Sequence, residues 1–129
     1  MRTPEEILRT AHTIAVVGAS PDPLRTSHRV MRYLQGAGYR CIPVNPNADE
    51  VLGERCYPAL ADINQPVDLV DVFRRVEFCP DVARDAVASG APALWLQLGL
   101  RSPEARTVAE AAGVDYVEDA CTAVVHRRL

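Results

Sequence analysis

The chain has 129 residues and an ordinary balance of hydrophobic and charged residues, which suits a single globular domain over residues 1–129. Its net charge of −3, without a basic stripe that carries aromatic residues, argues against a nucleic-acid partner. No apolar run approaches the roughly 20 residues of a membrane span and no signal-like segment follows Met1, so we expect a cytoplasmic protein without membrane contact.

The first two predicted elements are a short helix and a strand. Thr3, followed by Pro4 and two glutamates, is typical of a helix N-terminus, so we expect a helix over residues 4–10. Residues 13–17 are apolar or β-branched throughout. This composition predicts a strand that is buried on both faces.

A polar loop follows the first strand and leads into a second helix. Gly18 opens the loop, and apolar residues recur at helical spacing after Ser27. The pattern predicts a helix that begins near Ser27, with Ser27 as its N-cap, and that ends at Gly36. Residues 39–44 predict the next strand, in which Pro43 indicates an edge position or a strand end.

The rest of the chain continues the alternation of strands and helices. We expect a turn-rich loop over residues 45–53, a helical turn over 57–62, strands over 67–73, 93–98 and 114–117, and helices over 80–89, 103–112 and 121–128. Such alternation implies a parallel sheet with helices on both faces. The predicted fold is a single doubly wound, Rossmann-like α/β domain with a mainly parallel five-stranded sheet.

The carboxyl ends of the predicted strands are the expected ligand site. In doubly wound sheets ligands bind beyond these ends. The segments that meet there are residues 18–20, 44–46, 73–74 and 97–99. The helix after the first strand begins with unpaired N–H groups, which attract anions. The sequence therefore predicts a nucleotide-like ligand at this edge of the sheet.

The sequence favours coenzyme A over a dinucleotide. A dinucleotide fingerprint has three glycines, of which the loop keeps only Gly18. An NAD site also has an acid at the end of the second strand, where this chain has Val44 and Asn45. Arg25 and Arg74 suit the 3′-phosphate of CoA, because arginine binds phosphate in bidentate geometry. An NADP-type module remains an alternative.

Several other chemistries find no support in the sequence. All 14 basic residues are arginine, so a P-loop and a Schiff-base lysine are excluded. The four cysteines and three histidines show no metal-ligand spacing, and we expect no metal. Asp68 and Asp71 point to opposite faces of one strand and form no acid/base pair. Asp71 is expected to be buried and hydrogen-bonded, and to brace the neighbouring strand ends.

Four segments together resemble the small single-domain CoA-binding proteins, which are similar in fold to the CoA-binding domain of the succinyl-CoA synthetase alpha subunit. They are residues 14–23, 42–54, 67–75 and 94–99, and the resemblance runs over almost the whole chain. One departure lies near the C-terminus. Where the family commonly shows Arg-Cys-Pro-Lys, this chain has Ala-Cys-Thr-Ala around Cys121.

The resemblance implies a ligand contact in each segment. The phosphates would contact Gly18, Ala19, Ser20, Arg25 and Ser27, and the adenosine would contact Asn45 and Pro46. The nucleotide or the pantetheine arm would pass Phe73 and Arg74, and the path to the thiol would be lined by Gln97, Leu98 and Gly99. Cys121 is either a small buried residue or a thiol beside that of CoA. The implied function is binding of CoA or an acyl-CoA without catalysis. The alternative is an enzyme, or enzyme subunit, that acts on a CoA thioester.

Overall fold

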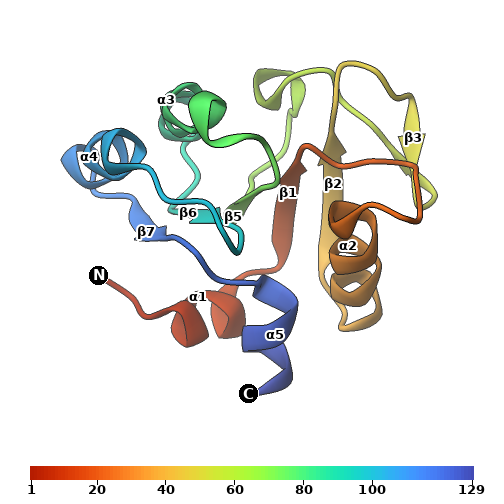
Figure 1. Ribbon diagram of the computed structural model, residues 1–129, viewed down its shortest axis with the longest axis horizontal. Helices are drawn as coiled ribbons and strands as arrows, with labels where there is room; N and C mark the ends of the chain where they lie inside the picture. The colour runs from red at the N-terminus through yellow and green to blue at the C-terminus, as the bar shows by residue number, and fades with distance from the viewer.

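A parallel five-stranded sheet forms the centre of the computed structural model, which describes residues 1–129 (Figure 1). Its strands are β1 (Thr13–Val17), β2 (Arg40–Val44), β5 (Leu69–Val72), β6 (Ala93–Leu96) and β7 (Asp115–Val117). They lie in the order β2-β1-β5-β6-β7, and every neighbouring pair is parallel. The predicted α/β fold is confirmed.

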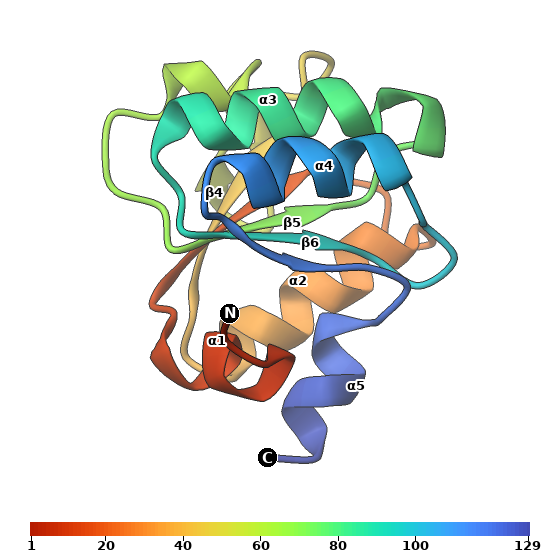
Figure 2. The ribbon, with the colours of Figure 1, turned by 90° about the vertical axis from the view of Figure 1, so that its left-hand side faces the viewer.

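Helices cover both faces of the sheet. Figure 2 shows α3 (Cys79–Ser89) and α4 (Pro103–Ala111) on one face, and α1 (Pro4–Thr10), α2 (Thr26–Gly36) and α5 (Thr122–Arg127) on the other. None of these helices combines the length and the apolar character needed to cross a membrane.

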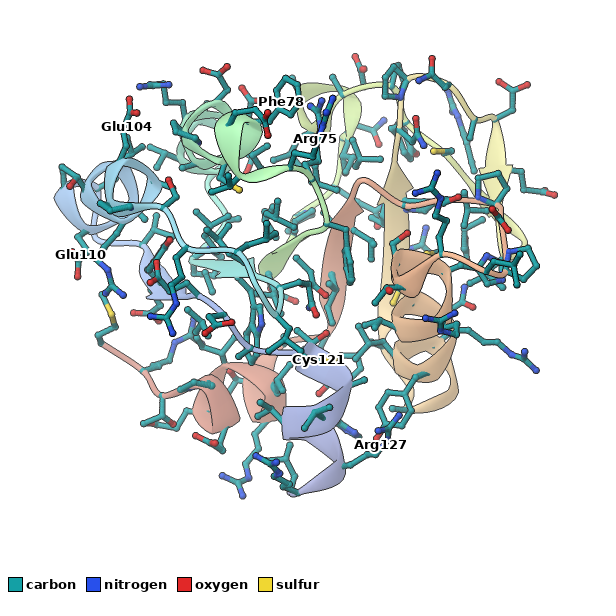
Figure 3. All side chains as sticks on the ribbon, in the orientation of Figure 1. Arg75, Phe78, Glu104, Glu110, Cys121 and Arg127 are labelled. Atoms are coloured by element: carbon teal, nitrogen blue, oxygen red, sulfur yellow. The ribbon has the colours of Figure 1, made fainter.

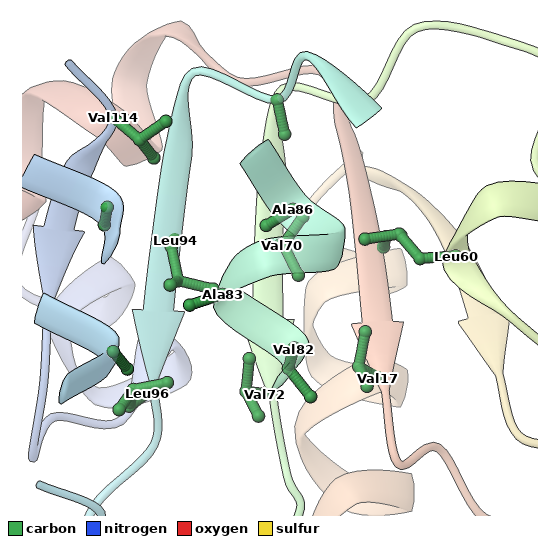
Figure 4. Packing of buried hydrophobic residues seen from close by; sticks show 14 of the residues in the cluster. Val17, Leu60, Val70, Val72, Val82, Ala83, Ala86, Leu94, Leu96 and Val114 are labelled. Carbon is green, nitrogen blue, oxygen red and sulfur yellow. The ribbon is translucent and has the colours of Figure 1, made fainter. Parts of the chain in front are cut away.

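Two apolar cores explain why the strands are mainly hydrophobic. Alternate residues of β1 point to opposite faces. Ala15 and Val17 pack under α3 and α4, and Figure 4 shows Val17 in this core. Ile14 and Val16 pack under α1 and α2. Trp95 of β6 is fully buried in the second core. A strand that is covered on both faces has no position left for a solvated side chain.

Most of the helix starts and ends that the sequence predicts are confirmed. The Oγ1 of Thr3 accepts the N–H of Glu6 at 3.1 Å, and the Glu6 carboxylate accepts the N–H of Thr3 at 3.0 Å. Ser102 caps α4 through a 3.1 Å bond from Ala105 N to its Oγ. Pro43 lies in β2, which is an edge strand as predicted.

The predicted N-cap role of Ser27 is wrong. The helix α2 begins at Thr26, and Arg25 is its N-cap residue. The carbonyl oxygen of Arg25 accepts the first intrahelical bond, from His28 N at 3.1 Å. Ser27 therefore lies in the first turn of the helix, where it is buried.

A short β-hairpin and a 3₁₀ helix were not predicted. The expected loop over residues 45–53 contains β3 (Glu50–Val51), which pairs with β4 (Glu54–Arg55) in an antiparallel hairpin. Leu52 and Gly53 connect these strands, both at positive φ, as a type I′ turn requires. The 3₁₀ helix η2 (Val76–Phe78) precedes α3, whereas the helical turn expected near residue 60 is confirmed as η1 (Leu60–Asp62).

Candidate functional site

The carboxyl ends of four strands are joined by backbone hydrogen bonds. Gly18 N donates to Val44 O at 3.0 Å, and Phe73 N donates to Val17 O at 2.8 Å. Gln97 N donates to the carbonyl of the last residue of β5 at 3.2 Å. The four segments predicted to share one edge of the sheet therefore do so.

Gly18 marks the closest approach between two of these segments. Its φ is +87°, a backbone conformation that residues with a side chain rarely adopt. A Cβ at this position would lie 2.7 Å from the carbonyl oxygen of Phe73. Only glycine lets the ends of β1 and β5 lie this close together.

Two adjoining cavities open at this edge of the sheet, with volumes of about 410 and 790 Å³. Both are lined by Gly18, Asn45, Phe73, Arg74 and Arg75. The other residues that line the first cavity include Pro46, Asn47, Leu60, Phe78, Val82 and Asp85. The other residues that line the second cavity are Ser20, Leu24, Arg25, Thr26, Ser27, Gln97, Leu98, Leu100 and Cys121. Each volume is in the range of small-molecule sites.

All predicted ligand residues except Ala19 and Gly99 line one or both cavities. Ala19 is fully buried, and its carbonyl oxygen accepts the side-chain amide of Asn45 at 2.7 Å. The N–H of Gly99 donates to Asp119 Oδ1 at 2.8 Å. In this structure these two residues shape the backbone behind the cavities and do not face them.

Asn45 uses both ends of its side chain within the protein. Besides the bond to Ala19, its Oδ1 accepts the N–H of Asn47 at 2.8 Å. The side chain thus ties the loop after β1 to the loop after β2. Its contribution to the site is to hold these two loops together.

The second cavity carries unpaired backbone donors. The N–H groups of Thr26 and Ser27, the first two of α2, reach no acceptor in the protein. The guanidinium of Arg25 lies nearby with its side chain 74% exposed, and its nearest acid is Asp22 at 4.0 Å. The free N–H groups at this helix N-terminus and a largely exposed arginine together favour an anion.

The wall between the cavities is cationic and aromatic. The guanidinium of Arg74 lies 4.1 Å from the ring centre of Phe78. That of Arg75 lies 5.7 Å from the same ring centre, and Figure 3 shows Arg75 beside Phe78. The sequence reasoning missed Arg75 and Phe78 as cavity residues. The Arg-Arg pair directly after the third predicted strand was the signal available for Arg75.

Carboxylates are scarce around the cavities. Asp85 of α3 is the acid that lines the first cavity, and no acid lines the second. Asp49 and Glu50, the acids that follow β2, line neither cavity. The end of β2 therefore lacks the ribose-binding carboxylate of an NAD site.

A buried polar cluster lies directly behind the second cavity. Asp71 is fully buried and accepts Gln97 Nε2 at 2.6 Å and the Thr122 hydroxyl at 3.0 Å. Burial raises the pKa of Asp71 to about 7, although both hydrogen bonds act in the opposite direction. The expectation of a buried, hydrogen-bonded Asp71 is confirmed, and the cluster links β5, the residue after β6 and the start of α5.

Known proteins share the sequence and the fold of this chain. A family model described as CoA binding domain matches residues 12–127. The uncharacterized protein YneT of Bacillus subtilis (strain 168) is 44% identical over 122 residues, which are 95% of this chain and 90% of that protein. The structure of a hypothetical protein from Pyrococcus horikoshii OT3 matches with a TM-score of 0.94 at 38% identity, over 99% of this chain and 92% of that one.

A longer protein shares part of the chain. Acetate–CoA ligase [ADP-forming] II of Archaeoglobus fulgidus is 31% identical over 80 residues, which cover 60% of this chain and 12% of the ligase. Together with the family model, which spans both cavities and all five strands of the sheet, these likenesses show that the chain belongs to the CoA binding domain family.

Proposed function

We propose that the protein binds coenzyme A or an acyl-CoA across the two cavities, and that binding is its whole biochemical activity. One observation carries the proposal: two joined cavities with unpaired N–H donors and three arginines lie at the strand ends of a CoA binding domain chain. An extended ligand with several phosphates suits such a site, because its charge is spread along its length.

The phosphates are assigned to the donors at the start of α2 and to the arginines. Thr26 and Ser27 offer backbone N–H groups, and Arg25, which lines the same cavity, offers a guanidinium. Arg74 and Arg75 line both cavities. A diphosphate between these two groups and a 3′-phosphate on an arginine would neutralise this concentration of positive charge.

The two ends of the ligand are assigned to different cavities. Asn45 and Pro46 border the first cavity, beyond the end of β2, where a doubly wound sheet holds the nucleoside. Gln97 and Leu98 border the second cavity, toward the start of α5. The pantetheine arm would therefore run past Gln97 and Leu98, with the thiol or acyl group at its end.

A dinucleotide is the second candidate, and Asp85 is the observation that favours it. A carboxylate in the first cavity could accept a ribose hydroxyl. However, Asp85 comes from α3 and not from the end of β2, and the loop after β1 lacks two of the three fingerprint glycines. These departures make NAD or NADP the weaker candidate.

The ligase relative raises the possibility of chemistry on a thioester. Its name describes the joining of acetate and CoA, and this chain matches 12% of its length. We propose that the shared part handles CoA and that the joining reaction requires the remainder of that protein.

Thermal unfolding with a panel of ligands tests the proposal. CoA and acetyl-CoA are expected to raise the Tm more than NAD(H) or NADP(H) at equal concentration, because a ligand stabilises the folded state according to its affinity. A larger rise with a dinucleotide would overturn the proposal. Steady release of free CoA from acetyl-CoA, faster than in buffer, would instead favour the thioester-cleaving enzyme.

A further inference from the structure

One of the four cysteines differs from the others in its surroundings. Cys41, Cys56 and Cys79 are buried in the cores, and burial raises the pKa of each thiol, that of Cys41 to about 12. Cys121 is half-buried and lines the second cavity. It stands directly before α5 (Figure 3) and is the cysteine that a cavity ligand can reach.

The residues on either side of Cys121 are fixed by hydrogen bonds from other elements. The carbonyl oxygen of Ala120 accepts the indole N–H of Trp95 at 2.8 Å. The hydroxyl of Thr122 accepts Gln97 Nε2 at 3.0 Å and donates to Asp71 at 3.0 Å. The backbone at Cys121 is therefore held in place at the cavity, while its thiol makes no hydrogen bond within the protein.

A second feature of the same cavity points to a ligand. Gln97 lines it and is 5% exposed, yet its Oε1 is the one buried side-chain polar atom without a hydrogen-bond partner. An acceptor that finds no donor in the protein is able to take one from a ligand. The amide N–H groups of a pantetheine arm are donors of this kind, and that arm ends in a thiol. The apolar side chains of Leu24, Leu98 and Leu100 line the rest of this path.

We infer that Cys121 is a thiol–disulfide exchange site, at which the protein captures CoA from CoA disulfide as a mixed disulfide. The inference rests on the proposed function, because binding of the CoA moiety brings the disulfide to the thiol. The Cys121 thiolate attacks one sulfur of CoA disulfide, the bond between the two CoA sulfurs breaks, and a new Cys121–CoA disulfide forms. The Cys121 sulfur is oxidised, the departing CoA sulfur is reduced, and that CoA leaves as a thiolate that takes up the proton.

Intact mass spectrometry of the reduced protein after treatment with CoA disulfide tests the inference. We expect one adduct, equal in mass to one CoA less two hydrogens, which peptide mapping places on Cys121 and which dithiothreitol removes. The three buried cysteines serve as internal controls. Cys121→Ser is expected to form no adduct, and its thermal unfolding without ligand shows whether it is folded.

The reaction rates of Cys121 with two different disulfides show whether binding of CoA directs the reaction. Cys121 is expected to react about tenfold faster with CoA disulfide than with 2-hydroxyethyl disulfide, because binding raises the local concentration of the reagent. Excess acetyl-CoA, whose thiol is blocked, should slow the reaction with CoA disulfide. Equal rates for the two disulfides, or an adduct on another cysteine, would overturn the inference.

The same samples distinguish failure of this inference from failure of the proposed function. If reduced CoA raises the Tm and no selective adduct forms, the exchange site is refuted and CoA binding stands. If CoA and acetyl-CoA leave the Tm unchanged, the proposed function fails and this inference fails with it.

Discussion

The two ends of the sheet differ in how their polar groups are hydrogen-bonded. At the amino end, one carboxylate oxygen of Asp68 accepts the N–H groups of His12 and Thr13, each at 2.9 Å. At the carboxyl end, the N–H groups of Thr26 and Ser27 have no acceptor in the protein. The free donors at the carboxyl end are available to a ligand, whereas the paired groups at the amino end secure the fold.

The two aspartates of one segment show the same difference. Asp68 lies at the amino end and caps the entry into β1. Asp71, three residues later, is fully buried behind the second cavity. Its carboxylate holds Gln97, which lines that cavity. Substitutions in matched pairs, one at each end of the sheet, can test this comparison.

The largest effect is expected at the glycine between the strand ends. Gly18→Ala should lower the free energy of unfolding by roughly 3–5 kcal/mol, because backbone strain adds to a clash with Phe73 O. Gly113→Ala is the matched control at the amino end. Gly113 has a φ of +73°, but its Cβ would meet open space, so only the strain of about 1–2 kcal/mol is expected. Equal losses in urea unfolding would refute the close approach.

The second prediction concerns the pH dependence of stability. Because burial raises the pKa of Asp71 to about 7, the folded protein keeps a proton that the unfolded chain releases from about pH 4 upward. The contribution of Asp71 therefore lowers stability as the pH rises from about 4 to 7, by up to about 1.4 kcal/mol per pH unit. Asp71→Asn cannot ionise and should lose this decline.

Asp68→Asn is the control for that measurement. It removes a carboxylate at the amino end and should keep the decline that Asp71 causes. Urea unfolding across this pH range gives the slope for each protein. If wild type and Asp71→Asn show the same slope, Asp71 does not hold its proton in the folded state.

The third and smallest effect is expected in ligand affinity. Arg25→Ala should weaken CoA binding by roughly 1–3 kcal/mol if the guanidinium holds a phosphate. Arg40→Ala is the matched control, since Arg40 lies at the amino end of β2 and donates to Gln65 Oε1 at 3.2 Å. Its Kd for CoA should equal that of the wild type. An unchanged Kd for Arg25→Ala would remove Arg25 from the site.

Local sequence signals predicted the parts of the fold that depend on local physics. Runs of apolar β-branched residues gave the strands, and the capping residues Thr3 and Ser102 gave two helix starts. The N-cap prediction for Ser27 was wrong, because a hydroxyl near a helix start is a common cap, whereas in the structure the Arg25 carbonyl accepts the first bond of the helix. The β3–β4 hairpin could not be predicted, because strands of two residues have no period to detect.

The candidate site was predictable where it depends on strand ends alone. Parallel topology brought Gly18, Asn45, Phe73 and Gln97 to one edge, as expected from the order of the elements. The outer walls were not predictable, because they arise from how η1, η2 and α3 pack against the sheet. Phe78 and Asp85 enter the first cavity only through that packing.

Isothermal titration of the purified protein with CoA, dephospho-CoA and NAD tests the central claim most directly. The claim is that the unpaired donors and arginines at the carboxyl end of the sheet form a CoA site. We expect CoA to bind most tightly, dephospho-CoA more weakly because it lacks the 3′-phosphate, and NAD most weakly. Equal affinity for CoA and NAD, or no measurable heat with CoA, would contradict the account.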